Sequence, residues 1–414
     1  MNKNKYLIKQ AQEAFYKNDY NTSQMIYLSK YESDNNLWFY GLEAFRSSIY
    51  KEKFDNPSNI VDNCLMFAPN YSKRNSYQTN LYSQHKNLGY NICFLSNPTL
   101  NNIPSKFLIA KNKIFHQHWV KPFYYESINM EDGVTRINNY INILKIYKLF
   151  GVKILCTIHN LLDHDINDMQ KQLNIYANKK ISEISNKIYV FSKHSIEMLC
   201  KQINFDISNK CIVLEHPLYY DILNCISQIP PELNIKYLYG KTVLLHVGIL
   251  KPYKGIVNLL KSFSLCSVNN LYLIIAGEIM DNNIIMTFEN LPSNIRNKIV
   301  IIKRRISDAE IKGLMEIADV IVNPYNKILT SGSFYLNTTF KKPTIAPNIG
   351  FFPEIINDNV NGFLFDSNKN NLVDIIKKVS TLDKSYLANI GEKNFKLYSH
   401  LTPQFISQKF FNSI

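Results

Sequence analysis

Two series of short apolar runs, each alternating with amphipathic segments, constrain the fold of this chain more than any other feature. The first series begins at about residue 60 and ends near residue 217, and the second extends over residues 242–382. Strands separated by helices form βαβ units and a parallel sheet. A double proline in "QIPPELNI" (228–235) separates the two series, as is typical of a linker. The sequence therefore predicts an α/β protein with two Rossmann-like, doubly wound domains.

The expected elements follow from the periodicity of each run. In the first series, the expected strands are "NICFL" (91–95), "KIFHQHW" (113–119), "VKILCTIHN" (152–160), "KIYVFS" (187–192) and "CIVLEHP" (211–217). In the second series they are residues 242–248, 271–277, 299–304, 319–324, 343–347 and 362–366. The expected helices are 76–89, 134–151 and 193–203, followed by 255–267, 307–317, 332–341 and 370–382. Ligands of such sheets bind outside the carboxyl ends of the strands, and we expect them in a cleft between the two domains.

The first 58 residues have a different pattern, which predicts a helical extension. Ala11, Ala14, Phe15, Tyr20 and Ile26 are spaced as in one helix pair of a tetratricopeptide-type repeat. A single unit of that kind cannot bury its own apolar face, so the extension is a candidate for binding a protein partner or a second copy. The expected boundaries are 1–58 for the extension, 59–228 and 236–385 for the two sheet domains, and 386–414 for C-terminal helices that pack back toward the first domain.

The net charge favours an anionic partner. The 414 residues include 47 Lys and Arg against 33 Asp and Glu, which gives a net charge of +14. Nucleic acid, a phosphate ligand and an anionic membrane surface all fit this charge. The lysines are spread along the chain, and a general preference for lysine explains the charge equally well. Clustered arginines with stacking aromatic residues on one element are not evident, so nucleic-acid binding is not expected.

Cysteine usage and hydropathy indicate a reduced, cytoplasmic environment. None of the seven cysteines lies in a C-x-x-C pair, which argues against a disulfide framework or a zinc site. The N-terminal segment has no apolar signal core. No apolar run reaches the roughly 18–20 residues that span a bilayer. We therefore expect a cytoplasmic protein whose contact with the inner membrane is at most peripheral.

The stretch "VLLHVGILKPYKGIVNLL" (243–260) has the features of an anion-binding loop. Gly248 permits a sharp turn at the end of the strand, and Gly255 permits a close backbone approach at the start of the next helix. Lys251 and Lys254 lie between them and place two ammonium groups at a helix N-terminus, which itself favours anions. A solvated lysine loop is the alternative interpretation.

A second segment, "PYNKILTSGSFYLNTTF", repeats this arrangement. Thr330, Ser331, Gly332 and Ser333 form a turn of small residues that opens a helix, where the hydroxyl groups can cap the helix or donate to phosphate. An ordinary capped helix is again the alternative. Two such turns in one domain indicate a nucleotide diphosphate. The sequence has no P-loop motif, and the absence of a G-x-G-x-x-G motif argues against a dinucleotide-dependent oxidoreductase.

These segments resemble those of the two-Rossmann-domain (GT-B) glycosyltransferases, specifically the family 4-like group that builds bacterial surface polysaccharides. The resemblance is carried, in order along the chain, by "NSYQTNLYSQHKNLGYNI", "HQHW", "TIHNLLDHD", "HVGILKPYKGIVNLLKSF", "ADVIVNPYNKILTSGS" and "PTIAPNIGFFPEIINDNVNGFLF". Many members of that group carry E-x7-E around the second anion-binding helix, where this chain has Ile328 and Leu336. Ile249 also replaces an arginine that is common in the group.

The resemblance implies a donor site in the second domain for a UDP- or GDP-sugar, which is a substrate, with no cofactor and no catalytic metal. Lys251 and Lys254 would stabilise the departing diphosphate. The loop 303–306 is expected to contact the base through backbone groups at Arg305 and Ile306. Glu354 resembles an acid near the floor of the donor pocket, and the alternative for it is a charge that complements a helix N-terminus.

In the first domain, the resemblance implies that His159 contacts the donor sugar, with a capping or core histidine as the alternative. Asp165, rather than Asp163, is the candidate general base if the enzyme inverts the anomeric configuration.

His116 and His118 share one face of a strand because they are two residues apart. Together with Trp119 they are interpreted as a platform for an acceptor sugar, and structural packing is the alternative.

Taken together, these features predict a sugar-nucleotide-dependent, metal-independent glycosyltransferase. Its expected acceptor is a saccharide or a polyprenyl-linked saccharide in the biosynthesis of a capsule, lipopolysaccharide or related surface polysaccharide. The basic charge would hold the protein near anionic lipid. The alternative is a non-catalytic scaffold of the same fold, which would bind partners through the helical extension. The absence of the E-x7-E pattern motivates that alternative.

Overall fold

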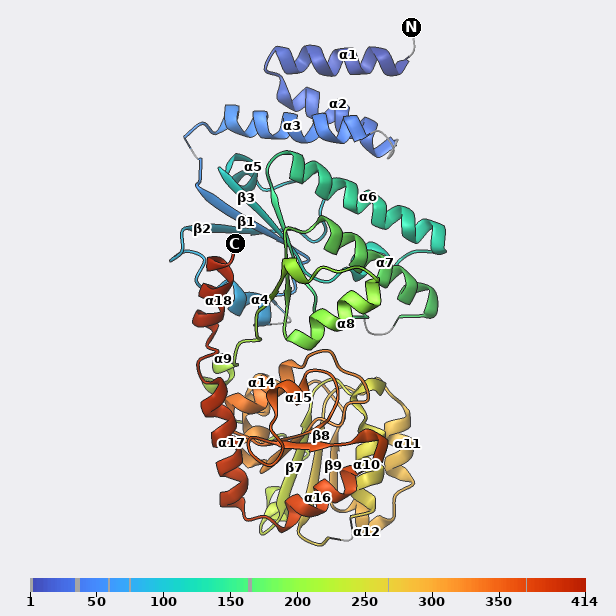
Figure 1. The fold of residues 1–414 in the computed structure, drawn as a ribbon, viewed down its shortest axis with the longest axis vertical. Helices are drawn as coiled ribbons and strands as arrows, with labels where there is room; N and C mark the ends of the chain where they lie inside the picture. The colour runs from blue at the N-terminus through green and yellow to red at the C-terminus, as the bar shows by residue number, and fades with distance from the viewer. Residues whose placement is uncertain are drawn as a thin grey trace. The chain divides into compact units, whose positions relative to one another are not determined.

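A computed structural model describes residues 3–33, 38–58, 60–73, 76–162, 166–266, 268–369 and 371–414. The chain divides into two compact units, Met1–Leu214 with Ser407–Ile414, and Glu215–Ile406. Each unit contains one parallel six-stranded sheet with helices packed on it, as Figure 1 shows. This confirms the predicted pair of Rossmann-like domains with an N-terminal helical extension, the GT-B architecture.

The sheet of the first unit has the strand order β2-β1-β3-β4-β5-β6, and every pair in it is parallel. Its strands are β1 (Asn63–Ala68), β2 (Tyr90–Phe94), β3 (Asn112–Gln117), β4 (Lys153–Thr157), β5 (Lys187–Val190) and β6 (Cys211–Val213). The sequence did not predict β1, which pairs with both β2 and β3. Because β1 is buried on both faces, it has no alternation of polar and apolar residues to mark it as a strand.

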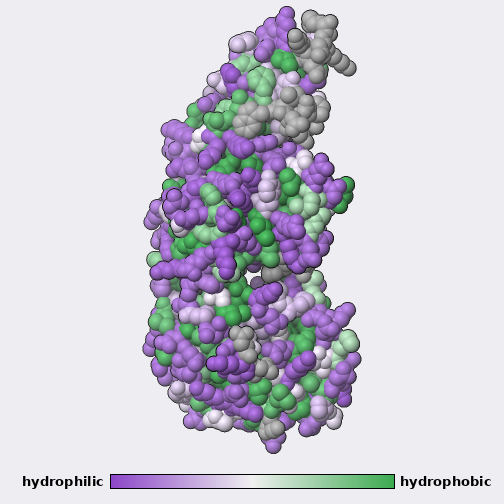
Figure 2. Space-filling view, turned by 45° about the vertical axis from the view of Figure 1, so that its right-hand side comes forward, coloured by the Kyte–Doolittle hydropathy of each residue, from purple (hydrophilic) through white to green (hydrophobic). Residues whose placement is uncertain are grey.

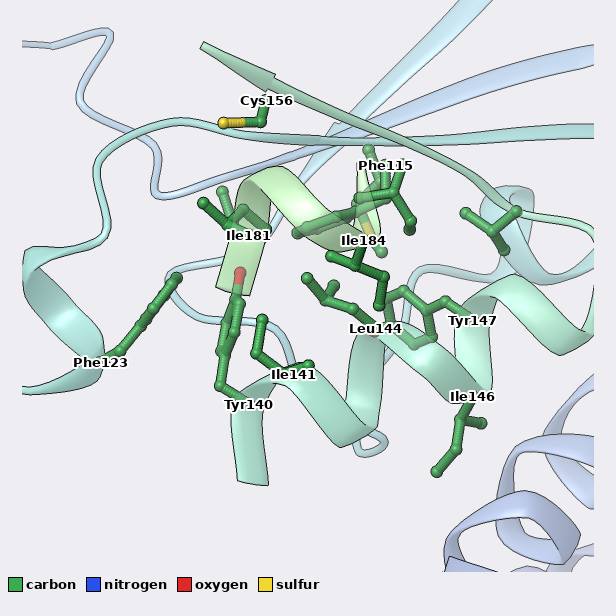
Figure 3. Packing of buried hydrophobic residues seen from close by; sticks show 14 of the residues in the cluster. Phe115, Phe123, Tyr140, Ile141, Leu144, Ile146, Tyr147, Cys156, Ile181 and Ile184 are labelled. Carbon is green, nitrogen blue, oxygen red and sulfur yellow. The ribbon is translucent and has the colours of Figure 1, made fainter. Parts of the chain in front are cut away.

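Helices of the first unit cover this sheet and enclose its core. They are α4 (Ser76–Leu81), α5 (Ser105–Ile109), α6 (Met130–Leu149), α7 (Asp168–Ile184) and α8 (Lys193–Ile203), with short 3-10 turns η1 (Lys121–Phe123) and η2 (Ser208–Lys210). Helix α7 was also not predicted, although Asn167 and Gln170 form a capping box at its start. In Figure 3, side chains of α6 (Leu144, Tyr147) and α7 (Ile181) meet Phe115 of β3 in this core.

The predicted helical extension consists of α1 (Lys3–Tyr16), α2 (Tyr20–Ser33) and α3 (Trp38–Asp55). Helix α3 packs on α6, because the ring of Phe45 lies 5.1 Å from that of Tyr147 and 5.0 Å from that of Phe150. A Cβ atom on Gly41 would approach Ile146 to 2.8 Å, so the two helices are in close contact. The extension therefore shares the hydrophobic core of the first unit.

The sheet of the second unit has the order β12-β11-β10-β7-β8-β9 and is also parallel throughout. Its strands are β7 (Thr242–Val247), β8 (Leu271–Ala276), β9 (Ile299–Ile302), β10 (Val320–Val322), β11 (Thr344–Pro347) and β12 (Phe363–Phe365). All six lie within the predicted ranges. The chain order reverses between β7 and β10, and such a switch point is where doubly wound sheets bind ligands.

The second unit also contains α-helices and short 3-10 turns. These are α9 (Tyr220–Leu223), α10 (Ile256–Ser264), α11 (Asn283–Glu289), α12 (Ser293–Arg296), α13 (Asp308–Ile317), α14 (Gly332–Thr339), α15 (Phe352–Ile355), α16 (Leu372–Thr381) and α17 (Lys384–Tyr398), with turns η3 (Ile235–Leu238), η4 (Pro252–Lys254) and η5 (Ser367–Lys369). Helix α18 (Pro403–Asn412) contains the point at which the chain leaves the second unit.

The second unit begins at Glu215, before the double proline that the sequence marks as a linker. Hydrogen bonds explain this position. The Gln228 N–H donates to the Ala309 carbonyl at 3.1 Å, and Lys312 Nζ donates to the carbonyl oxygens of Leu223 at 2.7 Å and Cys225 at 2.9 Å. The segment before the prolines is therefore attached to α13 of the second unit.

The described part of the chain shows no helix that could span a membrane. On the face drawn in Figure 2, hydrophilic residues predominate and hydrophobic residues are scattered among them. All seven cysteines are free thiols.

We predict that Gly391→Ala destabilises the second unit, although alanine in a helix interior normally adds about 1 kcal/mol of stability relative to glycine. A Cβ atom at Gly391 of α17 would lie 1.8 Å from the Lys341 carbonyl oxygen, which is backbone and cannot move away cheaply. We expect a net loss of about 1–3 kcal/mol in the free energy of unfolding, measured by denaturant titration. The control is Ser385→Ala at an exposed position of the same helix. Equal or higher stability of Gly391→Ala would contradict the close contact.

Candidate active site

Lys254 and the turn at residues 330–333 come together at the switch point of the second sheet. The loop with Lys254 follows β7, and the turn follows β10, the strand that pairs with β7. A Cβ atom on Gly255 would lie 1.9 Å from the Pro324 carbonyl oxygen, and the residue has a φ of +70°. The Asn326 N–H also donates to the Tyr253 carbonyl at 2.9 Å. Only glycine permits this approach at residue 255, so the two loops lie directly against each other.

The phenol of Tyr325 joins the two loops chemically. Lys254 Nζ donates to the Tyr325 hydroxyl at 2.7 Å and lies 4.2 Å from the centre of its ring. The Tyr325 hydroxyl donates to Ser333 Oγ at 3.2 Å, and Ser331 Oγ donates to the Tyr325 hydroxyl at 3.4 Å. The predicted anion site therefore has a common centre, Tyr325, which the sequence analysis did not identify although it follows a proline in the quoted motif.

The electrostatics of this pair favour a charged lysine. Burial opposes ionisation of both groups, but the attraction between them outweighs it. The pKa of Lys254 is raised because its ammonium group faces the phenol oxygen, and the pKa of Tyr325 is lowered by the ammonium group and by its hydrogen bonds. The site therefore holds a partly buried positive charge at neutral pH.

Ser331 occupies the N-cap position of α14, but its side chain makes no capping hydrogen bond. Its hydroxyl instead donates to Tyr325. The first N–H groups of α14 consequently lack the side-chain partner that a serine at this position usually supplies. Gly332 has no room for a side chain, because a Cβ atom would lie 2.6 Å from the hydroxyl of Tyr219.

Three buried polar atoms, one on β7 and two on the segment that follows β10, have no hydrogen-bond partner among the described residues: His246 Nε2, Asn323 Nδ2 and Thr330 Oγ1. His246 lies on β7 and is affected by the charge of Lys254, which contributes after burial to lowering its pKa to about 3. Its Nδ1 contacts the Val322 carbonyl at 2.8 Å, so the neutral ring donates there and Nε2 is an acceptor. Such a cluster fits a polar ligand, since buried polar groups are normally satisfied.

The other residues predicted for the donor site lie on the loops that follow β7 and β9 and on α15. Gly248, with a φ of +135°, directly follows β7, and Lys251 is the N-cap residue of the η4 turn. Arg305 is exposed after β9, and its carbonyl accepts from Arg304 Nη1 at 3.2 Å. Glu354 is exposed in the first turn of α15.

Arg304 holds the loop after β9, a role that the sequence analysis did not anticipate. Its Nε lies 2.7 Å from Glu232 and its Nη2 lies 2.6 Å from Glu310. The hydrogen bonds from Arg304 are the main cause that lowers the pKa of Glu310 to about 2. Arg304 therefore fixes the backbone at Arg305, which is the part of this loop predicted to contact a base.

The first unit brings His118, Trp119 and His159 together beyond the ends of β3 and β4. His118 Nδ1 lies 3.0 Å from His159 Nε2, and the rings of Trp119 and His159 stack with centroids 4.0 Å apart. His116 and His118 are completely buried, whereas Trp119 and His159 are partly exposed. The acceptor platform of His116, His118 and Trp119 stays a prediction. Of the three residues only Trp119 is partly exposed, and the two buried histidines contact other side chains of the core.

Asp163 and Asp165, the candidates for a general base, lie outside the described residues. Among the residues that the structure does describe, no cluster of three or more histidine, cysteine, aspartate or glutamate side chains is arranged to hold a metal ion.

Comparison with known proteins identifies the second sheet domain. Residues 236–396 match the family model "Glycosyl transferases group 1". This domain belongs to the group 1 glycosyl transferases. The match contains every residue predicted for the donor site, from Gly248 to Glu354, and it confirms the family resemblance. The chain is thus a glycosyltransferase.

Solved structures extend the likeness to both domains of this glycosyltransferase. Anabaena HepE in complex with UDP-glucose is 13% identical, has a TM-score of 0.60, and aligns over 84% of this chain and 98% of its own. A glycosyltransferase from Rickettsia africae is 18% identical, with a TM-score of 0.62 over 85% and 97%. Sucrose-phosphate synthase from Thermosynechococcus elongatus is 12% identical, with a TM-score of 0.62 over 84% and 98%. At these identities the likeness establishes the fold. No curated protein sequence matches the chain.

We predict that Tyr325→Phe destabilises the glycosyl transferase domain. The substitution removes the oxygen that accepts from Lys254 and leaves the ammonium group desolvated without that partner. Loss of a hydrogen bond to a charged group costs about 1.5–3 kcal/mol, which denaturant unfolding would detect. Tyr272→Phe on β8 is the control, since this buried tyrosine lies outside the Lys254 cluster. An equal effect of both substitutions would show that the Lys254 contact contributes nothing specific.

Proposed function

We propose that this glycosyltransferase transfers a sugar from a nucleoside diphosphate sugar, with UDP or GDP as the leaving group, to a saccharide or lipid-linked saccharide. The observation that carries the proposal is the convergence of Lys254, Ser331 and Ser333 on the hydroxyl of Tyr325 at the switch point of the second sheet. These groups place a partly buried positive charge and hydroxyl groups beside the first turn of α14. A diphosphate needs that combination.

The chemistry of the transfer follows from these groups. As the glycosidic bond to the donor breaks, negative charge grows on the departing diphosphate. A preorganised cation stabilises this charge more in the transition state than in the ground state and therefore accelerates the reaction. Lys254 is held in place by Tyr325 and by the close contact at Gly255, so little reorganisation is needed. Lys251 would add a second ammonium group on the same loop.

The three buried atoms that have no hydrogen-bond partner among the described residues also suit a nucleoside diphosphate sugar. Thr330 Oγ1 and Asn323 Nδ2 can donate to phosphate or sugar oxygens, and His246 Nε2 can accept from a hydroxyl. Two of the similar structures support this assignment by their ligands, since Anabaena HepE was solved with UDP-glucose and with UDP and glucose. The donor is therefore proposed to bind at the ends of β7 and β10.

The acceptor side of the reaction is proposed for the first unit. Trp119 stacks on His159, and the ring of Tyr71 lies 5.1 Å from Trp119, so aromatic faces are available for a sugar ring. His159 is proposed to contact the donor sugar, with Asp165 or Asp163 as the base if the reaction inverts the configuration. A growing surface polysaccharide, reached at a membrane face by a protein with a net charge of +14, is the proposed acceptor.

We predict that Lys254→Ala lowers kcat/KM by about 100- to 1,000-fold, equivalent to about 2.7–4 kcal/mol of transition-state stabilisation. The assay incubates the purified chain with a panel of UDP- and GDP-sugars and measures released nucleotide. Lys261→Ala is the matched control, because Lys261 is exposed on α10 of the same domain. Near-normal kcat/KM in Lys254→Ala would place the diphosphate elsewhere.

The same assay tests whether protein cations supply the positive charge. We predict that an excess of EDTA leaves nucleotide release unchanged, because Lys254 and the N-terminus of α14 already occupy the position beside the diphosphate. Restoration of lost activity by added Mg²⁺ or Mn²⁺ would contradict this prediction. Release of no nucleotide from any donor would contradict the proposed function itself.

A further inference from the structure

Five side chains form a continuous hydrogen-bonded row inside the first unit, which we call the histidine relay. Thr157 Oγ1 lies 2.8 Å from His116 Nε2, and His116 Nδ1 lies 2.8 Å from the Tyr82 hydroxyl. The same hydroxyl lies 2.8 Å from His118 Nε2, and His118 Nδ1 lies 3.0 Å from His159 Nε2. The relay therefore connects a buried threonine on β4 to the partly exposed His159 through residues of two other segments, β3 with the residue after it and the residue after α4.

The internal members of the relay are uncharged at neutral pH. His116, His118 and Tyr82 are buried. Burial lowers the pKa of His116 well below its usual range, with smaller contributions from His118 and His159, and it lowers the pKa of His118 to about 3. Burial also raises the pKa of Tyr82 well above its usual value. Each imidazole therefore carries one N–H and one lone pair, and the phenol keeps its single proton.

This proton inventory leaves two complete hydrogen-bond patterns. In the first, Thr157 donates to His116, His116 to Tyr82, Tyr82 to His118, and His118 to His159. In the second, every donor points the other way. Any mixed pattern would bring two lone pairs or two N–H groups together, or would aim the Tyr82 hydrogen at no acceptor among the described residues. A buried group left without its partner costs about 1–3 kcal/mol.

The two patterns place the protons differently. The first puts the proton on Nδ1 of His116, His118 and His159. The second puts it on Nε2 of all three rings. The relay therefore requires the three histidines to share one tautomer, and it commits Nε2 of His159 to His118. Nδ1 of His159 then differs between the two patterns, with a proton in the first and a lone pair on the neutral ring in the second.

Ring packing keeps the relay in place at both ends. The ring of Phe410 stacks on His116 with centroids 5.1 Å apart and an angle of 15° between the planes. At the other end, Trp119 stacks on His159 at 12°. Gln117 holds the backbone between the two buried histidines and Trp119, because its Nε2 donates to the Trp119 carbonyl at 3.0 Å. These stacking contacts hold the ring planes of His116 and His159, so the position of the proton on each ring is what can still differ.

We propose that the histidine relay sets the tautomer of His159 and that Tyr82 and His118 are positioning residues for sugar transfer. The proposal rests on the proposed function, in which His159 contacts the donor sugar. A histidine presents either a donor or an acceptor to a sugar hydroxyl, and a buried partner on its second nitrogen decides which. Here that partner is itself controlled by a row of groups extending to Thr157.

The first test measures tautomers in the complete, unliganded protein. The chain is labelled with ¹⁵N-histidine, and the imidazole nitrogens are observed by long-range ¹H–¹⁵N correlation NMR at alkaline pH, where free imidazole is neutral. The signals are assigned from His116→Gln, His118→Gln and His159→Gln variants. We expect one shared neutral tautomer for the three rings. Different tautomers among the three would overturn the proposal. This result does not depend on any donor being turned over.

The second test interrupts the relay at its centre. Tyr82→Phe removes the hydroxyl between the two buried histidines and keeps the ring. We expect the NMR pattern of His159 to change and kcat for the sugar donor identified in the panel to fall by about tenfold or more, with KM changed less than about twofold.

The matched control is Tyr189→Phe. Tyr189 is equally buried and its ring lies 5.7 Å from that of His116, but its hydroxyl contacts Ser413 Oγ at 2.7 Å, outside the relay. We expect Tyr189→Phe to leave both the tautomers and kcat unchanged. A change in the tautomer of His159 without loss of kcat, or an equal loss of kcat in both variants, would overturn the positioning role. Failure of the proposed function would instead appear as absence of turnover in the wild-type protein.

Discussion

The contact between Lys254 and Tyr325 is the interaction on which the proposed donor site of this glycosyltransferase depends. An ammonium group in a protein interior loses its hydration, and the phenol oxygen at 2.7 Å together with the ring face compensates for that loss. The same oxygen contacts Ser331 and Ser333, so the group that holds the charge also positions the hydroxyls. The backbone contact at Gly255 makes this arrangement rigid, because Pro324 leaves no space for a side chain there.

A similar requirement organises the first domain. His116 and His118 are buried on one face of the sheet, where a polar ring must find partners for both nitrogens. Tyr82, Thr157 and His159 supply those partners. Both domains therefore place buried polar groups just beyond the ends of parallel strands, but they use them differently. The second domain stabilises a charge, and the first domain controls the protonation of a neutral ring.

Much of the fold was predictable because its periodicities are local. All six strands of the second sheet lie where the sequence placed them, and the family resemblance was confirmed by the match over residues 236–396. Strand β1 and helix α7 were not predicted from the sequence. Strand β1 is buried on both faces, so it lacks the alternation of polar and apolar residues that marks a half-buried strand. The second unit begins at Glu215, and the contacts of residues 223–228 with α13 that attach this segment to it are not visible in their composition.

The sequence by itself determined the sheet domains, the two helix-opening turns and the residue types that can hold a diphosphate, because each depends on neighbours only a few positions away. The tertiary structure alone decided which of these groups meet. Tyr325 lies 71 positions from Lys254, and Tyr82 lies 34 from His116 and 36 from His118. Contacts at such separations arise when strands pair and helices cover them. Whether a histidine faces water or completes a buried hydrogen bond is therefore set by the packing of the whole domain.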